Sequence, residues 1–323
     1  MEHKTINTSD FLKTISWLND SLIDWADAAR EYTMDGRQIQ HSQRSYIYSF
    51  NGAITSESGE YAFIYQKLGT KGLLLKNGEL LREINRSYYC ADVYEYPATF
   101  ITIEGITYLV HCPSEYCRLD FENAETGEII TDVSGRNPSD FFHSRLEVSP
   151  SGKYLMSKGW HWHPCDHIEV FKIKDCINNP VLLDNSALFP KVTAEVCTAS
   201  FINDTKVLIG SSDEIFNNGW TYFPEKHIAI WDLTTNQISV PVKVGAEFGN
   251  LFSINGELAW DTFKFPKIIN INTGEVLEKA ESVNSGGQRS SIVNKEELAQ
   301  IVFNSQTKQL AIANGESIEI LTP

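Results

Sequence analysis

Residues 146–173 read LEVSPSGKYLMSKGWHWHPCDHIEVFKI, and this stretch contains the plan on which the rest of the chain is built. Its apolar and polar side chains alternate with the period of half-buried strands, and Pro150 and Gly152 supply the chemistry of a tight turn. We expect strands over residues 146–148, 153–156 and 168–173. A turn over residues 149–152 joins the first two strands, and a loop over residues 159–166 leads to the third. Three short strands are not stable alone, so the unit requires neighbouring copies.

Turns of this kind occur seven times, 39 to 52 residues apart. They lie at Asp20, Gly59, Gly105, Gly152, Asp204, Gly256 and Thr307. Several short strands repeated at this period are typical of the blades of a β-propeller. The predicted blades span residues 12–40, 46–86, 97–132, 143–184, 195–243, 247–279 and 298–322, the last together with residues 3–7.

A second turn follows the third strand of most copies. Its sequence is Met-Asp-Gly-Arg, Lys-Asn-Gly-Glu, Glu-Thr-Gly-Glu, Thr-Thr-Asn-Gln or Asn-Thr-Gly-Glu, at residues 34–37, 76–79, 125–128, 234–237 and 272–275. Such sequences favour hairpins that lead to a fourth strand. The fourth copy has the longer segment 174–180 in this place.

The seventh copy ends before a fourth strand, because only Thr322 and Pro323 follow its third. We expect residues 3–7 to add the missing strand and so remove the exposed edges. The predicted fold class is therefore an all-β, seven-bladed β-propeller, a single domain over residues 1–323, closed by an N-terminal strand that completes the last blade. The alternative is six blades with residues 1–42 as a helical cap, since this segment contains helix-forming residues.

Composition limits the classes of function. The net charge of −15 argues against a nucleic-acid partner, because phosphate binding requires clustered Lys and Arg. The N-terminus has no apolar signal-peptide core, and no apolar run reaches the ~20 residues of a membrane span. The six cysteines form no C-x-x-C pair, so we expect free thiols in a reducing compartment. These features predict a cytoplasmic protein without a membrane partner.

One segment indicates a family. Residues 228–233 read IAIWDL, and the Trp231-Asp232 pair ends a third strand as in WD-repeat propellers, which the chain resembles in strand order over almost its whole length. The pair occurs in one copy only, and the Gly-His dipeptide of the family is absent from the sequence. The resemblance is therefore to a degenerate WD-repeat-like propeller. It implies a binding platform for proteins or peptides, and it implies no catalytic residues.

The resemblance also implies that loops between second and third strands share one face with the loops between blades. The long loops belong to blades four to six and are rich in aromatic residues, which is typical of binding surfaces. The predicted binding residues are Tyr116, Trp160, Trp162, His163, Phe216, Trp220, Tyr222, Trp260 and Phe263. The alternative for each ring is packing over the blades.

The densest cluster of metal-ligand residue types lies in the loop of the fourth copy. The weak candidates for metal ligands there are His161, His163, Cys165 and His167. Their spacing matches no standard zinc motif, and a recognition loop explains the histidines equally well. We therefore expect no cofactor and no stoichiometric zinc, which elemental analysis of purified protein would test.

Three functions compete at this point. The first is non-enzymatic binding of a protein or peptide through the aromatic face by a monomer. The second is a propeller enzyme, a hydrolase or lyase that uses a metal or an acid pair at the mouth of the channel. The third is assembly into a larger complex.

Overall fold

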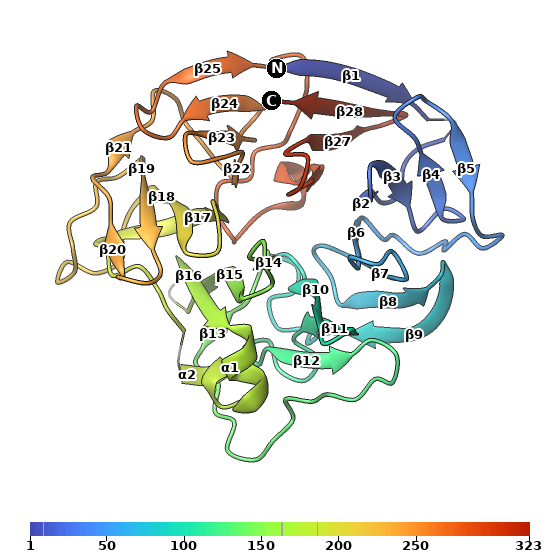
Figure 1. The fold of residues 1–323 in the computed structure, drawn as a ribbon, viewed down its shortest axis with the longest axis horizontal. Coiled ribbons are helices and arrows are strands. Elements are labelled where there is room, and N and C mark those ends of the chain that lie inside the picture. The colour runs from blue at the N-terminus through green and yellow to red at the C-terminus, as the bar shows by residue number, and fades with distance from the viewer. Residues whose placement is uncertain (9, 163, 186) are drawn as a thin grey trace. The chain divides into compact units, whose positions relative to one another are not determined.

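The computed structural model describes residues 1–8, 10–162, 164–185 and 187–323. The chain packs into two compact units. Figure 1 labels their helices and strands. The first comprises Met1–Tyr116, Asp120–Ile130 and Ala299–Pro323, and the second comprises Cys117–Leu119 and Thr131–Leu298. Within the described residues the first unit contains four small antiparallel sheets and the second contains three. These sheets are the blades of an all-β, seven-bladed β-propeller, and the predicted fold class is confirmed.

The four sheets of the first unit are built from short strands that pair antiparallel with their neighbours. In order within each sheet they are β2 (Ser16–Leu18), β3 (Ser21–Asp24), β4 (Arg30–Tyr32) and β5 (Gln38–Gln40); β6 (Gly52–Thr55), β7 (Tyr61–Tyr65), β8 (Lys71–Lys76) and β9 (Glu79–Asn85); β10 (Ala98–Ile103), β11 (Ile106–His111) and β12 (Asp120–Asn123); and β1 (Glu2–Asn7), β28 (Ser317–Thr322), β27 (Leu310–Asn314) and β26 (Gln300–Phe303). Apolar side chains from adjacent sheets form shared cores, such as Trp25 with Ile64 and Phe63 with Leu109.

The three sheets of the second unit follow the same plan with more irregularity. Their strands are β13 (Phe141–Phe142), β14 (Glu147–Val148), β15 (Tyr154–His161) and β16 (Cys165–Lys172); β17 (Ala194–Phe201), β18 (Lys206–Ile215), β19 (His227–Asp232), β20 (Gln237–Ile238) and β21 (Val242–Lys243); and β22 (Leu251–Ser253), β23 (Leu258–Asp261), β24 (Lys267–Asn270) and β25 (Val276–Lys279). The regular helices are α1 (Ile173–Asn178), α2 (Leu182–Asn185) and a single 3₁₀ turn, η1 (Lys295–Glu297). None of the helices formed by the described residues has both the length and the apolar character that a bilayer-spanning segment needs.

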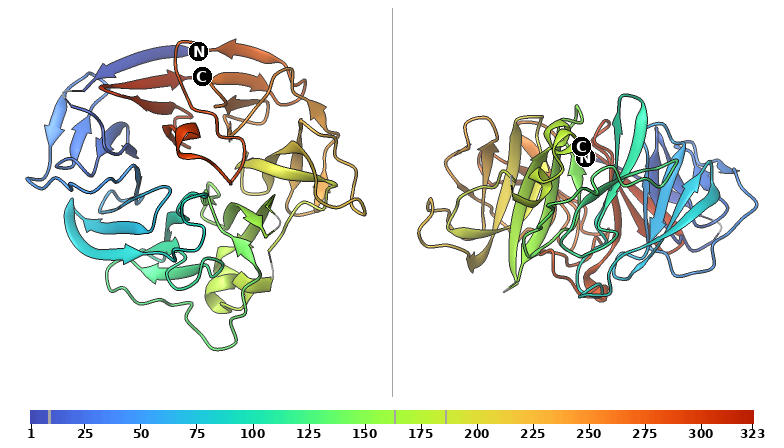
Figure 2. Two further views of the ribbon diagram at one scale, coloured as in Figure 1. Left: turned by 180° about the vertical axis from the view of Figure 1, so that it is seen from behind. Right: turned by 90° about the horizontal axis from the view of Figure 1, so that it is seen from below.

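The N-terminal strand completes the last sheet, as predicted. β1 pairs antiparallel with β28 from Glu2↔Thr322 to Asn7↔Ser317, and the two strands lie side by side in Figure 1 and in the left view of Figure 2. Ile6 of β1 is 3% exposed in the core that this sheet shares with the first sheet. Because residues 16–40 form β2 to β5, the alternative of a helical cap over residues 1–42 is wrong.

All seven predicted first turns lie between the first and second strands of their sheets. The hairpin chemistry is also confirmed, since Asn77 and Gly78 both take positive φ, at 51° and 79°, in the two-residue turn between β8 and β9. That geometry is the reason for the Asn-Gly pair, because most L-residues avoid positive φ. Turn chemistry therefore predicts the repeat reliably.

The expectation of four regular strands in every blade is wrong for the third and fourth sheets. The third sheet has β10, β11 and β12, and its returning segment makes only the isolated bridge Glu122↔Ile129. In the fourth sheet β13 and β14 both pair with β15, because Arg145 at φ 44° interrupts the first strand between them. Helix α1 occupies most of the longer segment 174–180, and α2 follows it where the fourth strand was expected. Among the described residues of this region, the isolated bridge Val170↔Leu188 continues the sheet.

The loop predicted over residues 159–166 is mostly strand. β15 continues to His161 and β16 begins at Cys165. Gly159 does not turn the chain: it pairs with His167, and a Cβ at this position would lie 2.0 Å from the carbonyl oxygen of Phe142. The glycine is required by the close approach of β13, since any side chain would collide with its backbone.

Candidate functional site

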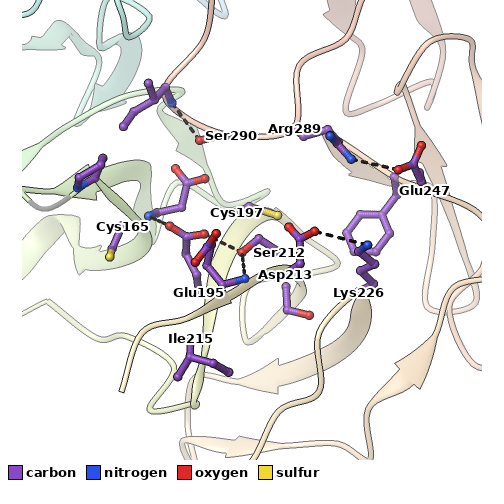
Figure 3. Close-up of a pocket in the computed structure, with 16 residues that line it drawn as sticks. Cys165, Glu195, Cys197, Ser212, Asp213, Ile215, Lys226, Glu247, Arg289 and Ser290 are labelled. Carbon is purple, nitrogen blue, oxygen red and sulfur yellow. Dashed lines mark hydrogen bonds and ion pairs between the residues drawn. The ribbon is translucent and has the colours of Figure 1, made fainter. Parts of the chain in front are cut away.

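The second unit contains a cavity of about 580 Å³ (Figure 3). It is lined by residues of β16, β17 and β18, by the segment between β21 and β22, and by the chain that follows β25. The lining residues are Pro164, Cys165, Asp166, Glu195, Cys197, Ser211, Ser212, Asp213, Glu214, Ile215, Lys226, Glu247, Phe248, Arg289, Ser290 and Ile292. This volume lies within the range of ligand sites in proteins.

Glu195 is a buried carboxylate of the cavity. It lies at the start of β17, is 7% exposed, and accepts hydrogen bonds from the Ser212 hydroxyl at 2.6 Å and from the Asp166 backbone N–H at 2.5 Å (Figure 3). Burial and the negative charge of Asp166 raise the pKa of Glu195 to about 7, although both hydrogen bonds act in the opposite direction. Glu195 is therefore poised to change its charge near neutral pH.

Asp166 anchors the wall of the cavity. This buried residue, the second of β16, accepts hydrogen bonds from the Ser291 backbone N–H at 2.8 Å and from the Ser291 hydroxyl. Burial raises the pKa of Asp166, while the positive charge of Arg145 and the hydrogen bonds from Ser291 lower it in part. The contact fixes residues 289–292 against the fourth sheet and so positions Arg289 and Ser290 at the cavity.

The charges of the cavity are unequal. Five lining residues carry carboxylates and two carry cations. The Lys226 Nζ lies 3.4 Å from Oδ2 of Asp213, and the Arg289 Nη1 lies 3.2 Å from Oε1 of Glu247 (Figure 3). Both cations are thus already paired with carboxylates. The cavity presents an excess of negative charge beside an apolar wall.

The cavity also contains two thiols. Burial raises the pKa of Cys165 and of Cys197, and nearby carboxylates raise both further. Both thiols are therefore protonated at neutral pH and are poor nucleophiles. Within the described part of the chain no three His, Cys, Asp or Glu side chains are arranged to hold a metal ion.

The structure places three of the predicted binding residues in the core. Trp160 is 3% exposed and stacks on Phe142, with ring centroids 3.8 Å apart and planes 7° apart. Trp260 and Phe263 are buried as well. All three rings pack inside the fold, which is what the alternative of packing over the blades expects, so they are left out of the binding surface proposed below.

The other predicted aromatic residues differ in exposure. Trp162 is 48% exposed at the β15–β16 turn, and Tyr222 is 75% exposed in the β18–β19 loop. Phe216 and Trp220 are half-buried and pack on each other with centroids 5.4 Å apart. Tyr116 is half-buried and belongs to the first unit. His163 lies outside the described residues.

The histidines of the fourth sheet pack as aromatic rings. Burial lowers the pKa of His161 and lowers that of His167 to about 3, so both rings are neutral at physiological pH. His167 stacks on Phe216, with centroids 5.1 Å apart and an interplanar angle of 15°. Cys165 lies at the cavity instead. The expectation of no stoichiometric zinc stays a prediction.

Sequence reasoning missed the carboxylates of the cavity. Glu195 lies in the apolar segment of β17, AEVCTASF, in which every residue is buried. The sequence carries no signal that sets this carboxylate apart, because its alternation with apolar neighbours is typical of a half-buried strand with one solvent-facing side. The cavity nevertheless lies among the loops of blades four to six, where the binding residues were sought.

No family model matches the sequence, and no curated protein matches it. Among solved structures, a chain in the crystal structure of the mitotic checkpoint complex aligns with a TM-score of 0.61 and 10% identity, covering 99% of this chain and 91% of that one. It is one of 1052 matching chains, so the likeness establishes the architecture alone. The Trp231-Asp232 pair fits this architecture: Trp231 is buried and Asp232 accepts backbone hydrogen bonds from Thr234 and Thr235. The fold is that of a WD-repeat-like β-propeller.

Proposed function

We propose that this protein is a non-enzymatic binding module that holds a protein or peptide segment over the cavity of the second unit. The observation that carries the proposal is the pairing of the cavity with exposed aromatic residues on its two bordering loops. Trp162 lies two residues from the lining residue Pro164, and Tyr222 lies between the lining residues Ile215 and Lys226. Tryptophan and tyrosine dominate the energy of many interfaces, and a cavity of this volume can take up a side chain of a partner.

The binding surface proposed here is narrower than the aromatic face predicted from sequence. It consists of the cavity together with Trp162 and Tyr222. Trp220 contributes to the fold as well, because its ring packs on Phe189 and Phe216 at centroid distances of 5.7 and 5.4 Å. Replacing Trp220 would therefore combine a loss of packing with any loss of binding.

A peptide library displayed on phage, selected against the immobilised protein, tests the proposal. We expect the Trp162→Ala/Tyr222→Ala variant to bind the selected peptides at least tenfold more weakly, or about 1.4 kcal/mol, because truncated anchors lose contact area with the partner. Tyr222 is 75% exposed, whereas the Trp162 ring is 48% exposed and contacts Trp160 and Phe142 at centroid distances of 6.0 and 6.1 Å. The melting temperature should therefore fall only slightly, and the single variant Tyr222→Ala should leave it unchanged.

The matched control is Tyr88→Ala, which removes a tyrosine that is 87% exposed in the first unit. This variant should bind the peptides as the wild type does. If no peptide is enriched, or if the double variant binds as tightly as the wild type, the binding surface is wrong.

The remaining features of the proposal concern partner and location. A cytoplasmic monomer, or one subunit of a larger assembly, fits the acidic composition and the six free cysteines. The net charge of −15 opposes nucleic-acid binding and favours a basic protein partner. Similarity to a chain of a protein complex supports protein partners without identifying one.

One contact favours a second candidate, a hydrolase. The Ser212 hydroxyl donates to Glu195, whose pKa of about 7 suits a general base that activates a serine nucleophile. A fluorophosphonate probe should label the wild type and leave Ser212→Ala unlabelled if this candidate is correct. Absence of labelling would leave the hydrogen bond with a structural role.

A further inference from the structure

The walls of the cavity combine apolar and acidic surface. Phe248 is buried at one wall, and Ile215 and Ile292 contribute further apolar surface. Asp166, Glu195 and Glu214 lie in the same cavity. Long basic side chains match this combination, since they pack their methylene stems on apolar surface and direct the charged group to carboxylates.

Among the described residues, three of the five carboxylates form no ion pair, although the positive charge of Arg145 acts on one of them, Asp166. Lys226 pairs with Asp213, and Arg289 pairs with Glu247. Within the part of the chain that the structure describes, no Lys, Arg or His lies at ion-pair distance from the other three carboxylates, Asp166, Glu195 and Glu214. The cavity therefore complements a ligand that brings its own positive charge, and the charge of −15 on the whole chain attracts such a ligand from a distance.

We infer that the bound segment is a basic peptide whose lysine or arginine side chain enters the cavity, with its stem on Phe248 and Ile215 and its cationic group at Glu195 and Glu214. This inference rests on the proposed function and specifies its partner. A cavity of about 580 Å³ has room for such a side chain and for part of the backbone that carries it.

The charged and titratable groups around Glu195 determine how binding depends on pH. Asp166 and Cys165 face it from β16, Cys197 from β17, and Glu214 from β18, while Asp213, Lys226, Glu247 and Arg289 complete the lining. Arg145, which donates to the Cys197 carbonyl oxygen at 3.0 Å, adds a positive charge that acts on Asp166 and Cys197. A cation favours the ionised form of Glu195. Since the pKa of Glu195 is about 7 in the free protein, affinity should rise about tenfold from pH 6 to pH 8.

The experiment uses a selected peptide, labelled for fluorescence anisotropy, and a second peptide in which norleucine replaces its basic residue. Norleucine keeps the stem and removes the charge. We expect the norleucine peptide to bind the wild type at least tenfold more weakly. The difference between the two peptides should become much smaller in Glu195→Gln, where Glu214 alone still attracts the cation, and this is the signature of direct coupling in a double-mutant cycle. The rise between pH 6 and pH 8 should disappear in Glu195→Gln and persist in the control Glu257→Gln, which removes an exposed carboxylate outside the cavity.

Failure of this inference can be distinguished from failure of the proposed function. Selected peptides that lack a basic residue, or a norleucine peptide that binds the wild type within twofold of the original, would overturn the inference. The proposed function would still stand if those peptides required Trp162 and Tyr222. Free putrescine that competes at the concentration of the peptide itself would assign the cavity to a small diamine and overturn the peptide assignment. Because the norleucine arm uses the wild-type protein, it remains decisive even if Glu195→Gln folds poorly.

Discussion

Deleting residues 1–7 should lower the free energy of unfolding by about 3–5 kcal/mol, because the last sheet then loses its outer strand. The strand contributes the buried Ile6 and the ladder of hydrogen bonds with β28. Glu319 of β28 also accepts hydrogen bonds from Thr5 at 2.7 Å and pairs with His3 at 2.8 Å. Chemical denaturation of the deletion variant and of the wild type measures the difference.

Two single substitutions divide this effect into its parts. Ile6→Ala should cost about 2–4 kcal/mol through the lost burial, whereas Glu2→Ala, at an exposed position, should cost less than about 0.5 kcal/mol.

The contribution of Glu319 depends on pH. Burial alone would raise the pKa of Glu319, but hydrogen bonds from Thr5 and His3 prevail and lower it. The stabilisation by Glu319 is therefore present above the unfolded pKa and is lost as the pH falls through the lower folded pKa. A deletion variant as stable as the wild type would contradict the closure of the propeller.

Arg136→Met should destabilise the protein by about 3–5 kcal/mol, because it leaves a buried carboxylate without its cation. Arg136 and Asp184 are both almost fully enclosed, with a shortest N···O distance of 2.8 Å. Asp184 lies in α2, and Arg136 also donates to the carbonyl oxygens of Thr131 and Leu119. The pair thus holds the helices that replace the outer strand of the fourth sheet. Thermal and chemical denaturation test this value.

The double variant Arg136→Met/Asp184→Leu should recover most of the lost stability, because neither charge then remains buried alone. The control is Arg37→Met, whose partner Asp35 is exposed, and it should cost less than about 1 kcal/mol. If Arg136→Met is no more harmful than Arg37→Met, the ion pair does not anchor the helices.

The repeat could be predicted from the sequence because its turns depend on local chemistry. Asn77 and Gly78 need only their own backbone preferences to form a turn, and the same holds for the other hairpins. The missing last strand indicated the role of residues 1–7 through a simple rule on sheet edges. Predicting the turns requires no knowledge of distant contacts, and predicting the closure requires only the rule that an exposed sheet edge must be paired.

The fourth blade could not be predicted in detail because its structure depends on contacts between distant residues. Gly159 looks like a turn residue, yet its role is set by the carbonyl group of Phe142. Helix α1 has only six residues, too few for a helical period to appear in the pattern of apolar side chains. The sequence shows that segment 174–180 is longer than the turns of the other copies, but it does not show that this segment is helical.

The candidate site shows the same limit. Trp160 and Trp162 have the same residue type and lie two positions apart, yet Phe142 covers one while the turn exposes the other. Glu195 alternates with Ala194 and Val196, a pattern that predicts a solvent-facing carboxylate. Only the folded chain shows that Asp166 and Ser212 enclose it.

A crystal structure of the protein with a selected peptide tests the central claim most directly. The account predicts a lysine or arginine nitrogen of the peptide within about 3 Å of a Glu195 carboxylate oxygen, with Trp162 and Tyr222 in contact with the flanking residues. A peptide bound at another surface, with neither aromatic residue in contact, would contradict it.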